Sequence, residues 1–352
     1  MKKLNSFQIA FAFSGSFVGA GLVSGQELYQ FFGVFGWYGI IGCILTTLAL
    51  SAIGYMAMSI AARQNQEHFD YVIAGDNNEK FRKAISYIVI ILTFGVMVIM
   101  IAGGGTLLYE KTGLPLWAGN LISVVLVTIA AYFGIYGLVK VFETLMPLLI
   151  LAAIAICVFT MFTVETVPIT ANAFYGENIL LGNWVSSAVT YISYNILAAI
   201  IIFVPIATKV QDIPTLRKGT VMGGAVLLVI FLSMIVGICA HEPLIADSEM
   251  PMLTLAGKMG GVINVVYAVL LYFGVFASTL SAVHAMRIKM KEPAQLSKNV
   301  KMIIILLAAY ILSLVGFKNL VSTVFPVCGY IGLVLLGGII VNYYKSRKKV
   351  NG

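Results

Sequence analysis

The amino-acid sequence has 352 residues, of which 60% are hydrophobic and 10% are charged. Too few polar side chains are present to cover a water-soluble globule of this size, so the composition excludes a soluble enzyme. The formal net charge of +8 does not indicate nucleic-acid binding, because the placement of Lys and Arg explains it as a topology signal. The partner that the composition predicts is a lipid bilayer.

Apolar stretches of about 20 residues, enough to cross a hydrocarbon core of ~30 Å, recur along almost the whole chain. We expect an all-α integral membrane protein with one membrane domain over 1–352 and no soluble domain, because the connections are short. The ten predicted transmembrane helices cover residues 6–33, 36–62, 83–110, 115–135, 138–162, 184–207, 219–240, 260–287, 299–317 and 319–344.

The distribution of Lys and Arg predicts the orientation. With both termini in the cytoplasm, only three of the 22 basic residues fall outside, at Lys111, Lys258 and Lys318. Basic residues concentrate on the cytoplasmic side of membrane proteins. We therefore expect a multi-pass protein of the cell membrane, meaning the inner or plasma membrane, with both termini cytoplasmic.

The predicted helices divide into two sets of five, residues 6–162 and 184–345. An odd number in each set makes the second set enter the membrane from the opposite side. This arrangement predicts an inverted repeat, which is common among secondary transporters.

The first helix of each set contains an unusual run near the bilayer midplane. Residues 14–21 read Ser-Gly-Ser-Phe-Val-Gly-Ala-Gly, and residues 190–195 read Thr-Tyr-Ile-Ser-Tyr-Asn. We expect both helices to be broken there. Lipid cannot satisfy the backbone groups that a break leaves without helical partners, but a bound ligand can. The amides after Gly19 would suit a substrate carboxylate and the carbonyls before it a cation. The alternative is close helix packing through the Gly15/Gly19 and Gly21/Gly25 pairs.

Residues around the two runs are the candidates for substrate binding. Unwound backbone at this depth needs polar neighbours, whereas aromatic residues on a helix more often belong to a core. A glycine run in the third helix could also line a pocket. The predicted substrate-binding residues are Phe17, Gly19, Ala20, Gly21, Gly104, Tyr191, Ser193, Tyr194 and Asn195.

Glu27 lies eight residues beyond Gly19, where the break is expected, or ~12 Å along a helix. An acidic side chain facing lipid is unfavourable, so we expect Glu27 to face an outer vestibule. Three roles stay open: attracting a cationic substrate group, carrying a proton for coupling, or joining a structural network with Gln26 and Ser24.

The motif Gly15-Ser-Phe-Val-Gly-Ala-Gly21, followed by Ser24-Gly25-Gln26-Glu27, resembles that of the YkvI-type amino-acid permeases. These are placed in the amino acid–polyamine–organocation superfamily, which has the LeuT fold. The resemblance covers the whole chain and implies a five-plus-five inverted repeat with broken helices 1 and 6. It also implies cation-coupled symport by alternating access, with an amino acid or related zwitterion bound between these helices.

Sodium-coupled members of the LeuT fold bind a cation with carbonyls at the helix 1 break, one carbonyl on helix 8 and two adjacent hydroxyls. Uncharged oxygen ligands suit a monovalent ion; alternatively, the hydroxyls bond within their own helix. The resemblance implies no cofactor and no metal apart from this sodium ion. The matching positions are Gly15, Val18, Val275, Ser278 and Thr279.

Some proton-coupled relatives carry a lysine in the middle of helix 5 in place of the ion. The helix 5 lysine of this sequence, Lys140, lies close to the predicted cytoplasmic end, which favours sodium over a proton. Glu27 and Glu143 keep a proton route open.

Other function classes are less favoured. The sequence contains no nucleophile elbow, zinc-protease helix or Walker loop, and His68, His241 and His284 fall at membrane edges or in loops. We therefore expect no enzyme. A channel, or a non-transporting sensor built on a transporter scaffold, is the alternative to a transporter.

Overall fold

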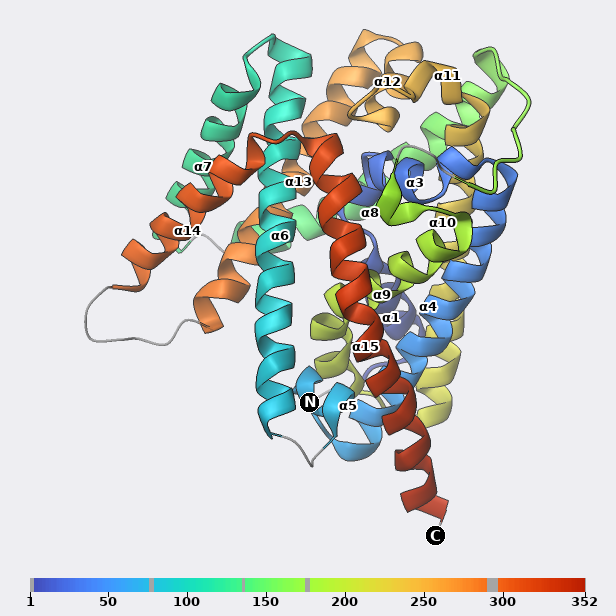
Figure 1. Cartoon of the computed structure of the whole chain (residues 1–352), viewed down its shortest axis with the longest axis vertical. Coiled ribbons are helices and arrows are strands. Elements are labelled where there is room, and N and C mark those ends of the chain that lie inside the picture. Colours follow the sequence, from blue (N-terminus) through green and yellow to red (C-terminus); the bar gives the residue numbers. More distant parts are fainter. Residues whose placement is uncertain (1–2, 76–78, 135–136, 175–177, 290–296, 352) are drawn as a thin grey trace.

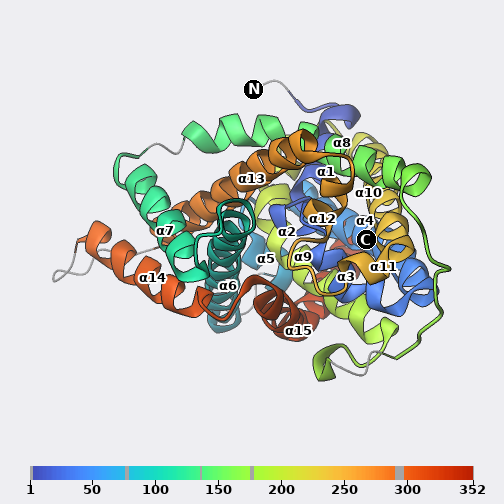
Figure 2. The same ribbon diagram turned by 90° about the horizontal axis from the view of Figure 1, so that it is seen from above.

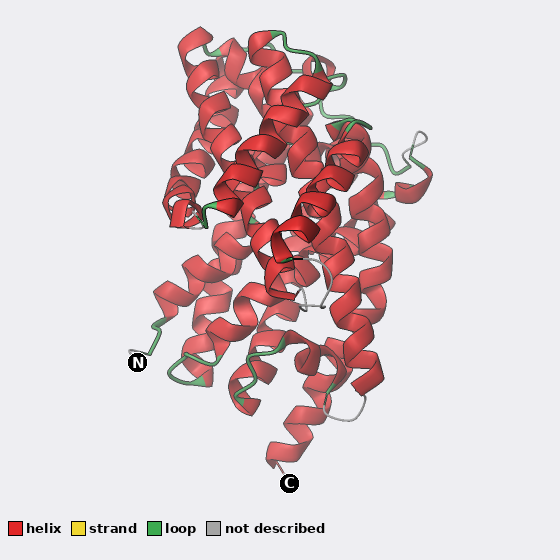
Figure 3. Cartoon of the chain, turned by 90° about the vertical axis from the view of Figure 1, so that its left-hand side faces the viewer, coloured by secondary structure: helices red, strands yellow, loops and turns green. Residues whose placement is uncertain are grey.

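The structure is a computed structural model that describes residues 3–75, 79–134, 137–174, 178–289 and 297–351. This part of the chain is almost entirely helical (Figure 3). Its only strand-like pairings are two isolated bridges, Leu4 with Val210 and Gly36 with Ala171. The all-α prediction therefore holds for the described residues.

The helices follow one another with short connections (Figure 1). In the N-terminal half they are α1 (Ser6–Phe17), α2 (Ala20–Val23), α3 (Gln26–Phe31), the 3-10 helix η1 (Gly33–Phe35), α4 (Trp37–Gln64), α5 (Phe69–Ala74), α6 (Glu79–Thr112), α7 (Leu116–Tyr132) and α8 (Gly137–Thr163). In the C-terminal half they are η2 (Ile179–Leu181), α9 (Trp184–Ala207), α10 (Ile213–Ala240), α11 (Glu242–Ile245), α12 (Pro251–Lys258), α13 (Gly261–Lys289), α14 (Lys298–Ser313) and α15 (Phe317–Asn351).

Seven described helices are long and apolar enough to cross a membrane, namely α4, α6, α8, α9, α10, α13 and α15. Two further apolar helices, α7 and α14, are shorter. The first predicted span is divided among α1, α2 and α3. The chain is therefore a multi-pass membrane protein whose hydropathy located the long helices to within several residues.

Local sequence signals explain where several helices begin. The Asn5 side chain accepts a hydrogen bond from the Gln8 amide, and the Asn183 side chain accepts from Val185 and Ser186 at the start of α9. Such caps satisfy amides that have no partner within the helix. Asp212 caps α10, where hydrogen bonds from Thr215 hold the pKa of the Asp212 carboxyl below its usual value.

The long helices pack in pairs that correspond between the two halves. Helix α1, which begins the first half, packs against α10 of the second half. Correspondingly, α9 of the second half packs against α4 of the first half. Likewise α8 contacts α13 and α10, while α15 contacts α6 and α4. Seen from above, α7 and α14 lie together at the edge of the bundle beside α6 (Figure 2).

The first and last described helices start and finish at one end of the bundle, opposite α11 and α12 (Figures 1 and 3). At this end the Leu4 amide donates to the Lys209 carbonyl at 3.0 Å, and the Ser6 hydroxyl donates to the Thr215 carbonyl at 3.2 Å. The start of α1 is thus tied to the connection between α9 and α10.

Candidate functional site

The first predicted span is interrupted at Val18 and Gly19. Helix α1 ends at Phe17, Val18 (φ −95°, ψ 104°) and Gly19 (φ −115°, ψ 175°) are extended, and α2 begins at Ala20. The last carbonyls of a helix and the first amides of the next have no partner within those helices. The last carbonyls of α1 and the first amides of α2 therefore lack partners within their own helices, at the position that the sequence predicts.

Open space surrounds the glycines of this break. A Cβ placed on Gly15 or on Gly19 would meet no atom within 4 Å. Gly15 is exposed and Gly19 is half-buried. Close helix packing is therefore the wrong explanation for Gly15 and Gly19, because a Cβ there would contact nothing, whereas a Cβ on Gly25 would lie 2.9 Å from Met252 of α12.

A second turn follows at Ser24 and Gly25. Gly25 has a φ of +82°, which L side chains rarely adopt, and it changes the course of the chain before α3. Residues 21–31 are all buried. Three hydrogen bonds anchor the carbonyls of the segment formed by α2 and α3. The Tyr267 hydroxyl donates to the Val23 carbonyl (2.5 Å), the Met252 amide to the Ser24 carbonyl (3.0 Å) and the Ser187 hydroxyl to the Phe31 carbonyl (2.6 Å).

Glu27 does not face an outer vestibule, so that prediction is wrong. Its side chain turns back toward the break, and one carboxylate oxygen lies 2.6 Å from where a Cβ on Gly21 would be. Only 6% of the residue is exposed. The prediction failed because it assumed a continuous helix, whereas the turn at Gly25 returns Glu27 to the interior.

Helix α9 supplies the polar groups that face the Glu27 carboxylate. The hydroxyl of Tyr191 and the amide of Asn195 lie beside it. Met100 of α6 also reaches Gly21. We call Gly21, Glu27, Met100, Tyr191 and Asn195 the Glu27 cluster.

The predicted break in helix 6 is wrong, because α9 is continuous from Trp184 to Ala207. Its polar side chains bond within the helix: the Thr190 hydroxyl donates to the Ser186 carbonyl at 2.8 Å, and Asn195 donates to the Tyr191 carbonyl at 3.1 Å. Such bonds satisfy the side chains without interrupting the helical ladder.

The two faces of α9 have different neighbours. Thr190 and Ser193 lie against Gly329 and Gly332 of α15, where a Cβ could not fit. On another side of α9, the Tyr191 ring packs against the rings of Phe31 and Phe32, with centroid distances of 5.1 Å and 4.9 Å. Of the predicted α9 residues, Tyr191 and Asn195 therefore join the Glu27 cluster, whereas Ser193 packs on α15.

Several buried polar groups near this region have no hydrogen-bond partner among the described residues. They include both amide atoms of Gln26 and the hydroxyls of Tyr191, Ser193 and Tyr194. An unpaired buried polar group is unfavourable by about 1–3 kcal/mol. Gln26 is next to Glu27 in the chain and Tyr191 is near the Glu27 carboxylate, whereas Ser193 faces α15; unpaired polar groups beside a buried carboxylate are typical of a site that takes a polar ligand.

The predicted cation-site segment of α13 lies beside the break. A Cβ on Gly274 would lie 3.8 Å from the Cβ of Ala20. The Thr279 hydroxyl donates to the Val275 carbonyl at 2.8 Å, so these two predicted ligands bond to each other within the helix. Thr279 is buried and Ser278 is half-buried.

Phe17 and Gly104 are further predicted substrate residues that lie outside the Glu27 cluster. Phe17 packs edge-to-face on Phe13 with centroids 5.1 Å apart. Gly104 lies at a helix contact, where a Cβ would meet the Ser123 hydroxyl at 2.5 Å. Met100 was missed because no sequence signal marks it, and Gln26 was considered only as part of a structural network with Glu27.

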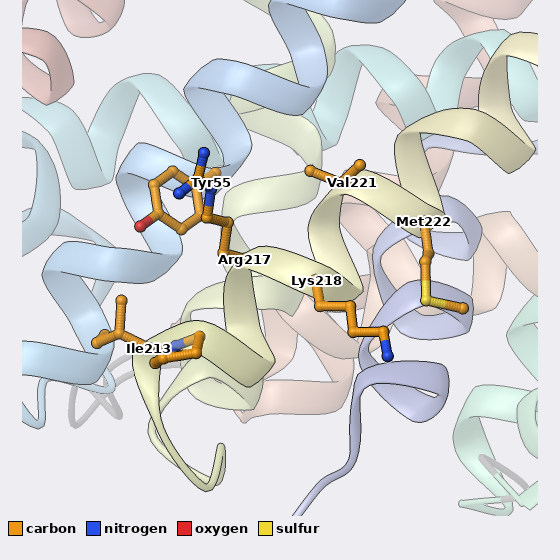
Figure 4. Close-up of a pocket in the computed structure, with 7 residues that line it drawn as sticks. Tyr55, Ile213, Arg217, Lys218, Val221 and Met222 are labelled. Carbon is orange, nitrogen blue, oxygen red and sulfur yellow. The ribbon is translucent and has the colours of Figure 1, made fainter.

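Two surface cavities lie away from the break. One of about 450 Å³ lies near the start of α10 and is lined by Tyr55 of α4 together with α10 side chains (Figure 4). Its basic residues, Arg217 and Lys218, are exposed. The other, of about 420 Å³, lies between α6 and α13 and is lined by Leu107, Lys111 and Tyr272 among others. Neither includes a predicted site residue.

The helix arrangement and the interrupted first span define a multi-pass membrane protein with a fold known from transporters. No family model matches the chain. It is 24% identical over 348 residues to the membrane protein YkvI of Bacillus subtilis (strain 168), covering 99% of each chain. The resemblance to YkvI-type proteins is therefore confirmed over the full length.

Solved structures share the fold. A variant of the Eremococcus coleocola manganese transporter is 15% identical, with a TM-score of 0.60 over 94% of this chain and 78% of that one. MhsT in complex with L-phenylalanine is 13% identical (TM-score 0.59, 93% and 87% covered). A Na⁺-coupled sialic acid symporter is 12% identical (TM-score 0.61, 97% and 79% covered). These are LeuT-fold transporters and not enzymes.

Proposed function

We propose that the protein is a secondary active transporter of a small solute that works by alternating access. The observation that carries this proposal is the break between α1 and α2 at Val18 and Gly19, beside a cluster of buried polar side chains. Backbone of this kind is tolerated in a membrane only where it lines a cavity or binds a ligand.

The proposed architecture has ten transmembrane helices in a five-plus-five inverted repeat, residues 6–162 and 184–345. The corresponding packing of α1 on α10 and of α9 on α4 supports it. The break itself is restricted to the first helix, since α9 is continuous. We place the protein in the cell membrane with both termini in the cytoplasm, as the basic residues predict.

The moving part in this proposal is the group formed by α1, α4, α9 and α10. These four helices pack extensively on one another, while α6 packs mainly with α7, α13 and α14. The break and the Glu27 cluster lie where the two groups meet, since Met100 of α6 and Gly274 of α13 approach Gly21 and Ala20. Relative motion of the groups would open the site to either side in turn.

The proposed solute is an amino acid or a related zwitterion, and the proposed coupling ion is sodium. The similar structures include one with L-phenylalanine and one described as Na⁺-coupled. The carbonyls of Gly15, Val18 and Val275 and the hydroxyls of Ser278 and Thr279 would bind the cation. Proximity of α13 to the break supports this site.

Manganese is not proposed as a substrate, although one similar structure is a manganese transporter. The part of the chain that the structure describes contains no group of three His, Cys, Asp or Glu side chains able to hold a metal ion. A divalent transition metal needs such donors.

The test is uptake of radiolabelled amino acids by proteoliposomes under imposed sodium or proton gradients. Accumulation above the outside concentration supports symport if it requires an inward sodium gradient. Ser278→Ala should raise the sodium concentration needed for half-maximal uptake. A matched control is Ser233→Ala, whose hydroxyl bonds within α10 to Val229.

Flux without accumulation would indicate a channel. Ligand-dependent stabilisation without any flux would indicate a sensor. Proton-driven uptake that ignores sodium would overturn the cation assignment while leaving a transporter.

A further inference from the structure

Glu27 is a buried carboxylate without a positive partner. Among the described residues the one ion pair within 4.0 Å joins Lys83 and Glu79 at the surface. The groups that face Glu27 are the Tyr191 hydroxyl and the Asn195 amide from α9, with Met100 from α6. An ionised carboxylate in such surroundings is unfavourable unless a cation pairs with it.

Aromatic rings enclose the same region. Besides Phe31 and Phe32, Tyr191 contacts Tyr194 with centroids 5.2 Å apart and Phe231 at 6.0 Å. Tyr194 stacks in parallel on Phe325 of α15 at 4.7 Å. Ring faces attract ammonium groups, most strongly where water is excluded. A carboxylate among rings therefore matches an organic cation better than an anion.

Two carboxylates from the end that carries α11 and α12 contact residues of α3 and α6, the helices that supply Glu27 and Met100. The Tyr29 hydroxyl, two residues after Glu27, lies 3.4 Å from a carboxylate oxygen of Glu242. Thr106, on the same helix as Met100, donates to Glu249 at 2.9 Å. Carboxylates near a binding site raise the local concentration of cations.

A substrate carboxylate could not occupy the same place. The Glu27 oxygen already covers Gly21, the residue whose amide the sequence assigned to a substrate carboxylate. Two like charges in a site of low dielectric repel strongly. The open space at Gly15 and Gly19 remains for the rest of the solute.

We propose that Glu27 binds the ammonium group of the substrate, so that the site selects solutes with a free cationic amine and does not require a carboxylate. This inference rests on the proposed function for its transport readout, although not for its binding readout. It names the part of the substrate that is recognised and the side chain that recognises it.

The experiment uses three matched sets in the full-length protein: leucine, lysine and phenylalanine, each with its decarboxylated amine and its N-acetylated form. Thermal stabilisation in detergent measures binding, and proteoliposome uptake measures transport. In at least one set, we expect both the amino acid and its amine to stabilise the protein and to be taken up. We expect no N-acetylated form to do either.

The variant Glu27→Gln keeps the size of the side chain and removes its charge. The half-saturating concentration of the active amine should rise by about 30-fold or more, the usual range for losing one member of a buried charge pair. Glu79→Gln, at an exposed salt bridge, is the control and should change nothing. The wild-type comparison of the matched sets stands even if Glu27→Gln does not fold.

The outcomes separate this inference from the proposed function. Uptake of N-acetylated forms equal to that of the free amino acids would overturn ammonium recognition and leave a transporter. Amine-dependent stabilisation that Glu27→Gln abolishes, without uptake, would support the ammonium site and overturn transport. If Glu27→Gln removes only a proton dependence and keeps the preference for amines, Glu27 is a proton carrier and the inference is wrong.

Discussion

A matched pair of alanine substitutions tests the interpretation of the interrupted first span. At Gly25 the φ of +82° is unfavourable for alanine by about 1–2 kcal/mol, and the new Cβ would lie 2.9 Å from Met252 Cγ and 3.2 Å from Pro251 Cβ. Gly25→Ala should therefore lower the melting temperature by about 2–4 °C, from the scaling of large chains. At Gly19 the backbone suits any residue and the space is open, so Gly19→Ala should not lower it.

Thermal unfolding of both purified variants, together with uptake, is the assay. Because Gly19→Ala fills space beside the unpaired peptide groups, it should reduce uptake at unchanged stability, whereas the effect of Gly25→Ala begins with stability. Equal destabilisation by the two substitutions would refute the reasoning, since it would mean that Gly19 is packed against a neighbour.

Three further substitutions test individual contacts. Ser187→Ala removes the donor to the Phe31 carbonyl and should destabilise by about 1–2 kcal/mol; thermal unfolding beside the Ser233→Ala control measures it, and an unchanged protein would contradict the anchoring of α3. Tyr267→Phe removes the 2.5 Å bond to Val23, and a loss of about 1–2 kcal/mol is expected; no shift in melting would show that α2 is held otherwise. Tyr194→Phe removes a buried hydroxyl that lacks a partner among the described residues, so stability should stay or rise, and a clear fall would reveal a bond.

The long helices could be predicted from the sequence because lipid imposes a simple rule on their length and composition. Seven predicted spans correspond to single long described helices such as α4 and α10, and their ends differ by several residues. The break in the first span was also predictable. Glycines at Gly15 and Gly19 weaken a helix wherever they occur, and no tertiary contact is needed to see that.

The behaviour of α9 could not be predicted in the same way. A run of polar residues either interrupts a helix or bonds within it, and the choice depends on neighbours that the sequence does not show. Here Thr190 and Asn195 bond to carbonyls one turn back, and glycines 329 and 332 of α15 leave room for the polar face.

The position of Glu27 depended on one backbone angle. A continuous helix would have carried it ~12 Å outward, whereas the left-handed turn at Gly25 directs it back over Gly21. The glycine was visible in the sequence, but its conformation was not. The same turn brings Met100 into the site, a contact across more than 70 positions of chain that no local pattern marks.

The gap in the peptide hydrogen bonds at Val18 gives the first span a hinge. On the far side, three donors from separate elements fix α2 and α3. On the near side, α1 is fastened at Leu4 and Ser6 to the start of α10. Because rotation about Val18 breaks no hydrogen bond of α1 or α2, the angle between these two helices can change while the bonds from Tyr267 and Met252 hold α2 and Ser24 in place.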